Sequence, residues 1–319
     1  MRGITWLRKC GIKQRLAGPL ALLLLLAAPA AEAQHWYNRK AEKRIKPTVV
    51  TIKPPADPPA VREALVEARK LEGQFKDSEA LAQFQEILKI NPKHFQALCE
   101  SAVLSVHIGA RYSDETRKSA YFDAARRYAD RALLLQPEAG ESSYAVALAM
   151  FNQATLRTAR ARLQAFRDLR PYVYLATEKL PNSPEAWQLL GRWQFRVAHY
   201  NLLERAYSKI VLGGVPAGGD SRAAMASLEN ARVLAPKRLQ FCYDLARMYH
   251  FQGRRRRAIA VLHEAEKIVP TTSDELVVSR LCRQMLKPLV RKDQRKRKRE
   301  AGRQPKTGAV PDSSAARSK

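Results

Sequence analysis

A pattern of three apolar residues followed by a proline recurs five times along this chain of 319 residues. The apolar residues stand twelve, eight and five positions before the proline, so all three lie on one stripe of a helix. The proline then ends the helix, because it has no amide hydrogen to donate. The pattern therefore predicts a stack of repeated helices. Its copies are Ala80, Phe84, Ile87 and Pro92; Ala125, Ala129, Ala132 and Pro137; Ala224, Leu228, Ala231 and Pro236; Ala258, Leu262, Ala265 and Pro270; and a weaker one, Leu169, Val173, Ala176 and Pro181.

A second helix pattern precedes the proline-terminated helix in the last two units. It reads Trp187-x2-Leu190-Gly191 in the fourth unit and Cys242-x2-Leu245-Ala246-x2-Tyr249 in the fifth. Pro236 and Pro270 are 34 residues apart, which is the period of tetratricopeptide repeats (TPR). The other proline spacings, 45, 44 and 55 residues, indicate insertions. The predicted fold class is all-α: a degenerate TPR solenoid of about five helix pairs plus a C-terminal capping helix.

The longest predicted insertion spans residues 201–219. Its first part, Leu202 to Tyr207, is predicted to be an extra helix, and its end is rich in glycine. Such a loop can cradle a phosphate, but no Gly-Lys-Ser/Thr sequence follows, and Asp220 as N-cap would repel an anion. A flexible connection is the preferred interpretation. Thr271 to Glu275 supply cap residues for a final helix that reaches about Val290 and covers the end of the stack.

Residues 1–33 have the order of parts of a secretory signal peptide. Basic residues precede an apolar run from Leu20 to Ala28, and the small residues Ala31 and Ala33 precede the expected cleavage after Ala33. The apolar run is shorter than the ~20 residues that span a bilayer, so cleavage is favoured. The alternative is a membrane anchor through residues 17–31. The protein is thus expected to be exported to the periplasm or cell envelope.

Cleavage would leave three cysteines, Cys99, Cys242 and Cys282. An odd number, with one in each of three predicted helices, indicates buried thiols that act as small apolar side chains. A bridge between Cys242 and Cys282 would require neighbouring helices in a favourable register.

The formal charge of +27 is divided equally among three segments, because residues 1–54, 55–286 and 287–319 each carry a net charge of +9. Two thirds of the excess positive charge therefore lies in the two terminal segments. Four domains follow: the signal peptide, a basic proline-rich linker over residues 34–59, a TPR-like domain over residues 60–290, and a basic disordered tail over residues 291–319.

The sequence from Leu189 to Ala198, which includes Leu190-Gly191-Arg192-Trp193, resembles the regulator of microtubule dynamics family of TPR proteins. The similarity continues through Ala223 to Ala235 and Tyr243 to Pro270, and more loosely back to about Val61. Eukaryotic members of this family are associated with microtubules and mitochondria, and bacterial relatives are exported or belong to the cell envelope. The resemblance implies a TPR fold, and the signal segment points to an exported relative.

In a TPR stack the first helix of each pair lines the concave groove, and its residues outside the core point into the groove. Arginines among aromatic rings suit an acidic peptide or a C-terminal carboxylate. The alternative is that these arginines are solvated or pair with Glu185 and Asp244. Trp187, Leu190 and Gly191 are expected in the core. The predicted groove residues are Gln188, Arg192, Phe195, Arg196, Tyr243, Arg247 and His250.

Two arginine- and lysine-rich runs are candidates for a basic surface. One follows Gly253 in the predicted turn between the helices of the fifth unit, and the other lies in the predicted tail. Each run can contact an anionic polymer or lipid. The alternative is that the arginines of the turn are only hydrated and bind no partner. The residues are Arg254, Arg255, Arg256, Arg257, Arg295, Lys296, Arg297, Lys298 and Arg299.

No catalytic, cofactor or metal residue is assigned. The six histidines include no helical His pair, His263-Glu264 lacks the second histidine of a metalloprotease motif, and no nucleophile elbow, dinucleotide fingerprint or phosphate loop occurs. The leading hypothesis is a non-enzymatic scaffold or adaptor that binds a partner protein or peptide, acidic in character, in its groove. The alternatives are a microtubule-associated regulator whose basic tail binds tubulin and, last, nucleic-acid binding through the tail.

Overall fold

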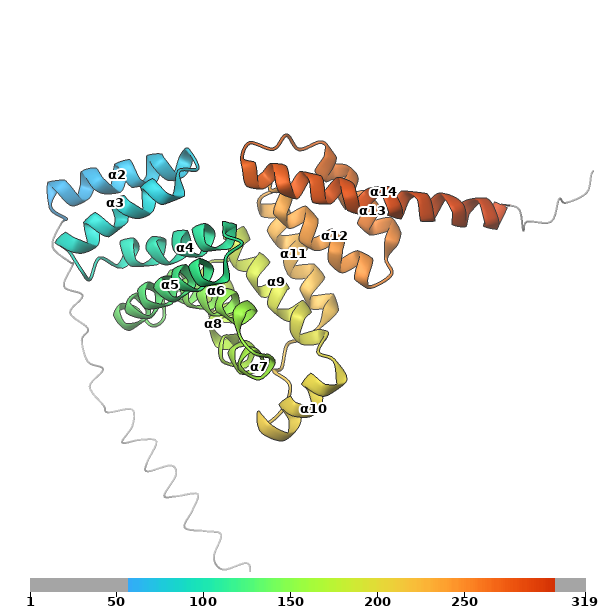
Figure 1. The fold of residues 1–319 in the computed structure, drawn as a ribbon, viewed down its shortest axis with the longest axis horizontal. Helices are drawn as coiled ribbons and strands as arrows, with labels where there is room; N and C mark the ends of the chain where they lie inside the picture. Colours follow the sequence, from blue (N-terminus) through green and yellow to red (C-terminus); the bar gives the residue numbers. More distant parts are fainter. Residues whose placement is uncertain (1–56, 302–319) are drawn as a thin grey trace, which may run out of the picture. The chain divides into compact units, whose positions relative to one another are not determined.

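The computed structural model describes residues 57–301, which form helices joined by turns, without a strand in that range (Figure 1). Five helix pairs follow one another, as the repeat pattern predicts. We call the first member of each pair helix A and the second helix B. The pairs are α2 (Pro59–Gly73) with α3 (Asp77–Ile90), α4 (Phe95–Arg111) with α5 (Glu115–Leu135), α6 (Gly140–Leu156) with α8 (Arg170–Lys179), α9 (Pro184–Ala198) with α11 (Ser221–Leu234), and α12 (Leu239–Phe251) with α13 (Arg255–Glu266).

The predicted apolar stripe of helix B is the core of the stack. All fifteen of its residues, from Ala80 to Ala265, are at most 1% exposed. Small residues on this stripe allow close contact between helices. A Cβ at Gly191 in α9 would lie 3.0 Å from the backbone oxygen of Ala224 in α11. The predicted burial of Gly191 and Leu190 is confirmed.

The two tryptophans of α9 have different surroundings. Trp193 is fully buried, and its indole nitrogen donates to the Phe166 carbonyl oxygen at 2.8 Å. Trp187, which the sequence placed in the core, is only half-buried. Its indole nitrogen donates to the Pro181 carbonyl oxygen at 2.8 Å, so one edge of the ring stays at the surface because its polar atom binds the preceding turn.

The N-termini of α9 and α11 carry side-chain caps. Asp220 accepts a hydrogen bond from the Ala223 amide at 2.8 Å and caps α11, as predicted. Ser183 caps α9 by accepting from the Ala186 amide at 3.2 Å. The first helix begins at Pro59, one residue before the predicted domain start, because proline is suited to the first helical position.

Two short helices interrupt the pairs. One is α7 (Ala159–Asp168), between α6 and α8, and the other is α10 (Leu202–Val211), between α9 and α11. The predicted extra helix is therefore confirmed and continues to Val211. A capping box starts it, in which Asn201 and Glu204 each accept from the other's backbone amide. The loop that follows turns at Gly213, Gly214 and Gly218, which have φ values of 72°, 125° and 93°.

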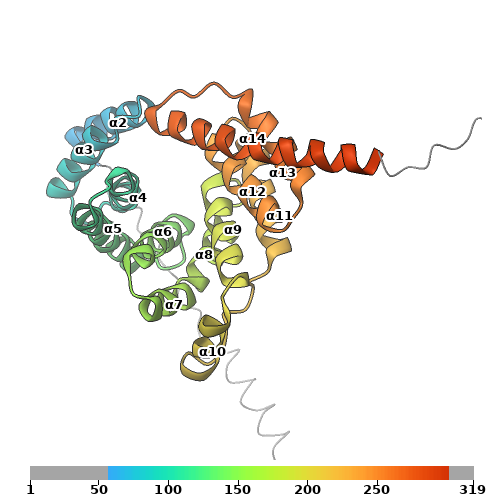
Figure 2. The ribbon, with the colours of Figure 1, turned by 45° about the vertical axis from the view of Figure 1, so that its right-hand side comes forward.

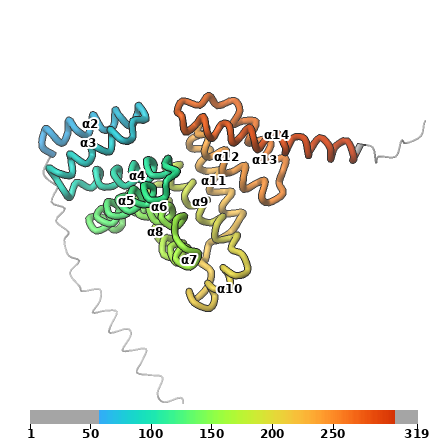
Figure 3. Tube along the Cα trace, viewed as in Figure 1, coloured from blue at the N-terminus to red at the C-terminus, as the bar shows by residue number. Residues whose placement is uncertain are grey.

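The pairs stack side by side along a curved path (Figures 2 and 3). Successive A helices contact one another, α4 with α6, α6 with α9 and α9 with α12. They lie on the inner side of the curve, and we call their solvent-facing surface the inner face (Figure 2). Arg111 at the end of α4 binds Asp77 at 2.5 Å and Asp274 at 2.7 Å. This arginine therefore links the first two pairs to the start of the last helix.

The last helix, α14 (Ser273–Ala301), starts where predicted, and Thr272 accepts from the Glu275 amide at 3.1 Å. It packs on α12 and α13, as expected of a capping helix. The predicted end near Val290 and the disordered state of residues 291–301 are wrong, because α14 continues through them. Asp293 explains this difference, since it is buried and binds Arg297 one helical turn later at 2.7 Å. Residues 302–319, like the predicted signal segment, cleavage position and most of the linker, lie outside the described residues.

The three cysteines of the described residues are free and buried, as predicted. Burial raises the pKa of the thiols of Cys99 and Cys282 to about 12, and it also raises the pKa of the Cys242 thiol. These thiols therefore stay protonated and behave as small apolar side chains. Between residues 57 and 301, no helix is both long and apolar enough to cross a membrane.

Candidate partner-binding site

Gln188 and Asp244 join the inner faces of α9 and α12. The Gln188 amide donates to one Asp244 carboxylate oxygen at 2.7 Å, and Gln240 donates to the other at 3.2 Å. Asp244 is 5% exposed, and these two hydrogen bonds compensate its burial. Gln188 thus has a packing role in addition to the predicted groove position, and Asp244 pairs with amides instead of an arginine.

The other predicted groove residues of α9 have separate surroundings. Arg192 is half-buried, with its guanidinium carbon 4.9 Å from the centre of the Phe151 ring on α6. Phe195 packs edge-on against Phe251 of α12, with ring centres 5.5 Å apart. Arg192 therefore remains at the inner face with its charge over an aromatic ring, whereas Phe195 mainly holds α9 against α12.

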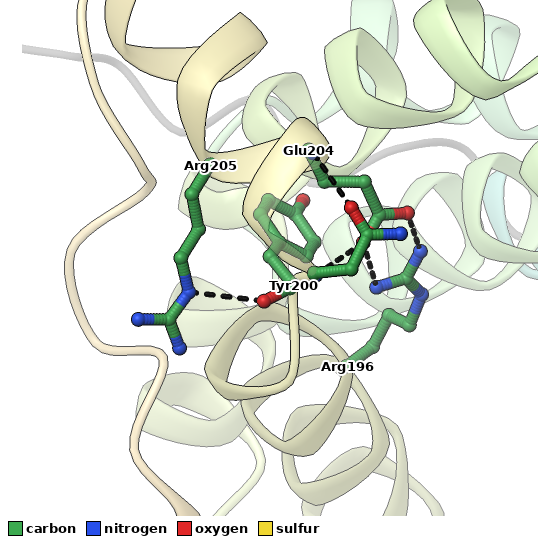
Figure 4. Close-up of polar contacts among 5 residues, drawn as sticks. Arg196, Tyr200, Glu204 and Arg205 are labelled. Atoms are coloured by element: carbon green, nitrogen blue, oxygen red, sulfur yellow. Dashed lines mark hydrogen bonds and ion pairs between the residues drawn. The ribbon is translucent and has the colours of Figure 1, made fainter.

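Arg196 points toward Glu204 of α10 (Figure 4). Its guanidinium binds both carboxylate oxygens of Glu204, one at 3.1 Å and the other more closely, and lies 5.0 Å from the centre of the Tyr200 ring. Burial opposes the shift, but Arg196 and the Asn201 amide together hold the pKa of Glu204 below its usual value. We therefore separate Arg196 from the groove residues, because its charge is already occupied by a bidentate pair.

The predicted residues of α12 are two exposed side chains, Arg247 and His250, and the partly buried Tyr243. Arg247 is exposed, and its guanidinium carbon lies 5.5 Å from the centre of the Tyr243 ring on the preceding turn. His250 is also exposed, three residues beyond Arg247. The stacked pair leaves the guanidinium edge open for a carboxylate.

The inner face also carries charged and titratable residues that the sequence analysis missed. His107 of α4 is solvent-exposed, yet surrounding protein lowers its pKa by desolvation, an effect that neighbouring Asp77 opposes. Arg238 and Glu185, from the fifth and fourth units, also contribute to the field at His107 and form an ion pair at 3.2 Å. Charged groups of the fourth and fifth units therefore act electrostatically on a residue of the second unit. On α6, in contrast, burial and Glu185 raise the pKa of Tyr144.

Two missed carboxylates lie on the first two A helices. Burial, together with Glu100 and Asp77, raises the pKa of Glu72 on α2 to about 7. Burial also raises the pKa of Glu100 on α4, against the opposing effect of Arg69. These two carboxylates lie on α2 and α4, where Arg69 and Arg111 accompany them, whereas Arg192 and Arg247 lie on α9 and α12, where Glu185 and Asp244 are already engaged with Arg238 and with amides. The sequence did contain a signal for this surface, because Gln96, Glu100, His107 and Arg111 follow helical spacing. The first two units, however, lack the helix A motif from which the groove residues of α9 and α12 were predicted.

The two predicted basic runs meet in the structure. Asp293 of α14 lies 3.9 Å from Arg256 and 2.7 Å from Arg297. Arg254 is the N-cap of α13, and the next three arginines form its first turn instead of the predicted loop, because Gly253, at φ 72°, makes the turn. Because cations are unfavourable at a helix N-terminus, these arginines do not stabilise α13 by their position. We call this surface the basic surface; it comprises Arg254, Arg255, Arg256, Arg257, Arg295, Lys296, Arg297, Lys298 and Arg299.

Two further features have local roles. His199 Nε2 lies 3.3 Å from the Ser221 hydroxyl, and its Nδ1 lies 2.7 Å from the Phe195 carbonyl oxygen, so the ring ties the end of α9 to the start of α11. A cavity of about 400 Å³ lies among α5, α6 and α7. Its Arg126 and Gln164 each bind an aspartate one turn away, at 2.8 Å. No group of three or more metal-ligating side chains occurs among the described residues.

The family comparison covers most of the described residues. Residues 64–290 match the family described as Regulator of microtubule dynamics protein 1-3. The chain belongs to this family. No curated protein matches it.

Several solved structures of TPR proteins are similar to this chain. TTC0263, a thermophilic TPR protein of Thermus thermophilus, is 17% identical with a TM-score of 0.51, over 70% of this chain and 98% of that one. YrrB, a TPR protein with an unusual peptide-binding site, is 16% identical with a TM-score of 0.35, over 69% and 98%. MamA of Desulfovibrio magneticus RS-1 is 14% identical with a TM-score of 0.38, over 67% and 97%. The first of these supports the TPR architecture.

Proposed function

We propose that this family member is an interaction scaffold that binds a partner protein or peptide on its inner face. The observation that carries the proposal is the presence on neighbouring A helices of the Glu185–Arg238 ion pair, at 3.2 Å, and of the Arg192 guanidinium over the Phe151 ring. Placing charged groups in a partly desolvated concave surface costs free energy. A partner with complementary charge would compensate this cost, which is the usual reason for such groups at functional surfaces.

The distribution of charge suggests the chemistry of the partner. Arg192 and Arg247 each present a guanidinium stacked on an aromatic ring, which suits an acidic segment or a C-terminal carboxylate. Glu72 and Glu100, on the opposite side, suit a basic segment. The proposed ligand is therefore an extended peptide with an acidic end on α9 and α12 and a basic end on α2 and α4.

Three labelled peptides of equal length test this proposal by fluorescence anisotropy: one rich in Asp, one rich in Lys, and one with a Lys block and an Asp block. The two-block peptide should bind most tightly. Replacing both arginines, Arg192→Ala with Arg247→Ala, should weaken it about tenfold or more, because charge-assisted hydrogen bonds are lost. Arg127→Ala, at an exposed position on α5, is the control.

The carboxylate variants complete the design. Glu72→Gln with Glu100→Gln should weaken the Lys-rich and two-block peptides but not the Asp-rich peptide. Equal affinities for all three peptides, or equal effects of the inner-face and Arg127 variants, would contradict the proposal.

We further propose that the protein is exported by its N-terminal segment. The support is the order of basic, apolar and small residues before Ala33. Intact-mass analysis of the protein from its native cell should give a chain that begins at Gln34. A chain that retains Met1 would instead indicate the anchor.

A second candidate function is binding to an acidic protein surface through the basic surface, as the family name suggests for microtubules. The meeting of two cationic runs around Asp293 favours it. The test is co-sedimentation with microtubules at low salt. Replacing Arg295, Lys296, Lys298 and Arg299 by Gln should abolish co-sedimentation if this function is correct; unchanged pelleting would remove it.

A further inference from the structure

The apolar side of α10 faces solvent. Leu202, Ala206 and Ile210 are four residues apart and therefore lie on one row of the helix. Leu202 and Ile210 are 85% and 82% exposed, and Leu203, beside this row, is 81% exposed. Val211, the last residue of α10, and Val215, in the loop that follows, are also exposed. We call these five large residues, Leu202, Leu203, Ile210, Val211 and Val215, the α10 stripe.

Polar contacts fix this orientation. Glu204 binds Arg196 of α9, and Arg205 donates to the carbonyl oxygen of Tyr200 at 2.9 Å (Figure 4). On the same side Ser208 is fully buried. The polar side of α10, together with Tyr207, thus faces the protein, whereas an ordinary surface helix turns its apolar stripe toward the core. The apolar side cannot turn inward without breaking these contacts.

Cations surround the stripe. Arg205 and Lys209 are exposed on α10 itself. Neighbouring α7 and α8 add more, because Arg167 donates to the Leu212 carbonyl oxygen at 2.7 Å and Arg170 to that of Ala217, also at 2.7 Å. Residues 157–170 contain five arginines and one aspartate. The surroundings of the stripe therefore carry a positive field that would attract an anionic surface.

We propose that α10 docks on an anionic lipid bilayer, with its stripe inserted at the boundary between headgroups and acyl chains. A helix with one apolar side and flanking Lys and Arg is suited to this position. A second copy of the chain fits less well, because a stable protein interface buries roughly 800 Å² on each partner over about 20 residues or more. The stripe has five residues and like-charged surroundings that would repel a second copy.

A site-specific reporter tests the proposal in the full chain. Leu203→Cys would carry an environment-sensitive nitrobenzoxadiazole label, with Cys10→Ser in every variant. The remaining cysteines are buried, with raised thiol pKa values, so they should not react. Leu134→Cys is the control, because Leu134 on α5 is 83% exposed and lies outside the stripe. Vesicles of phosphatidylcholine and phosphatidylglycerol in equal amounts should shift the emission of the label at 203 to the blue but not that at 134, and phosphatidylcholine alone should shift neither.

A second measurement uses sedimentation to compare how tightly the parent protein and two triple variants bind to these vesicles. Leu202→Ser, Leu203→Ser and Ile210→Ser together should weaken binding about tenfold or more, because apolar burial supplies the insertion free energy. The control variant combines Leu134→Ser, Val233→Ser and Val269→Ser, which alter similarly exposed apolar residues elsewhere, and should bind within about twofold of the parent.

Two outcomes would overturn the proposal. One is vesicle binding with no blue shift at 203, or equal binding by the two triple variants, since other cationic parts would then be responsible. The other is a blue shift at 203 that depends on protein concentration without vesicles, which would assign the stripe to a contact between proteins.

Discussion

Two neighbouring helices, α9 and α10, are held in the molecule by different forces. Helix α9 places Trp193, Leu190 and Val197 in the core, each at most 3% exposed. Helix α10 places its polar side against the protein and leaves its leucines in solvent. The comparison shows that the repeat stack rests on apolar burial, whereas α10 is attached through polar contacts and the packing of Tyr207 alone and leaves its other large apolar side chains in solvent, where they can serve a purpose other than stability.

The largest expected effect contrasts a buried with an exposed apolar side chain. Trp193→Ala should lower the free energy of unfolding by about 3–5 kcal/mol, because it creates a cavity and leaves the Phe166 carbonyl without its donor. Leu203→Ala should change it by less than about 0.5 kcal/mol. Urea denaturation followed by circular dichroism measures both. Similar losses would mean that α10 is part of the core.

A smaller effect concerns close contact inside the stack. Gly191→Ala should cost about 1–3 kcal/mol, because the new Cβ would lie 3.0 Å from the Ala224 backbone oxygen, which cannot move freely. Gly73→Ala, near the end of α2, meets no atom within 4 Å and should be neutral or stabilising by up to about 1 kcal/mol. The same denaturation experiment would contradict this account if the two variants behaved alike.

The stack could be predicted from the sequence because burial and periodicity are local signals. Helix B offsets such as Ala224, Leu228 and Ala231 identify a packing stripe without knowledge of its partner. Caps are local too, and Asp220 was correctly placed.

Tertiary contacts decided what the sequence did not show. Helix α14 passes Val290 because Asp293 is buried there, where it binds Arg297 at 2.7 Å and lies 3.9 Å from Arg256 of α13. Nothing in the sequence of α10 says which of its sides faces the protein, since the contact of Glu204 with Arg196 determines it. Glu72 and Glu100 were missed because α2 and α4 are brought near each other by α3, which packs on both.

The carboxylates of the inner face, Glu72 among them, differ from the polar contacts of α10, because burial of their charged form lowers the stability of the stack. With a folded-state pKa of about 7, above its usual 4.5, Glu72 binds a proton more readily in the folded chain. Stability should therefore fall as pH rises from about 4.5 through 7. Glu72→Gln should add about 1 kcal/mol at pH 8, after allowance for solvent screening, and nothing at pH 4. Glu67→Gln, at a partly exposed position on the same helix and paired with Lys70 at 3.0 Å, should keep the parent's pH dependence.

The smallest effect concerns the attachment of α10 itself. A double-mutant cycle of Arg196→Gln and Glu204→Gln should give a coupling free energy of about 0.5–1 kcal/mol at neutral pH, because the pair is partly exposed. Since the pKa of Glu204 is lowered in the folded state, the coupling should be lost as pH falls below 4.5. Hydrogen exchange should accelerate in α10 but not in α9, because only α10 depends on the pair. Equal acceleration in both helices would mean that they unfold as one unit, and the separation of forces between stack and insertion would then be wrong.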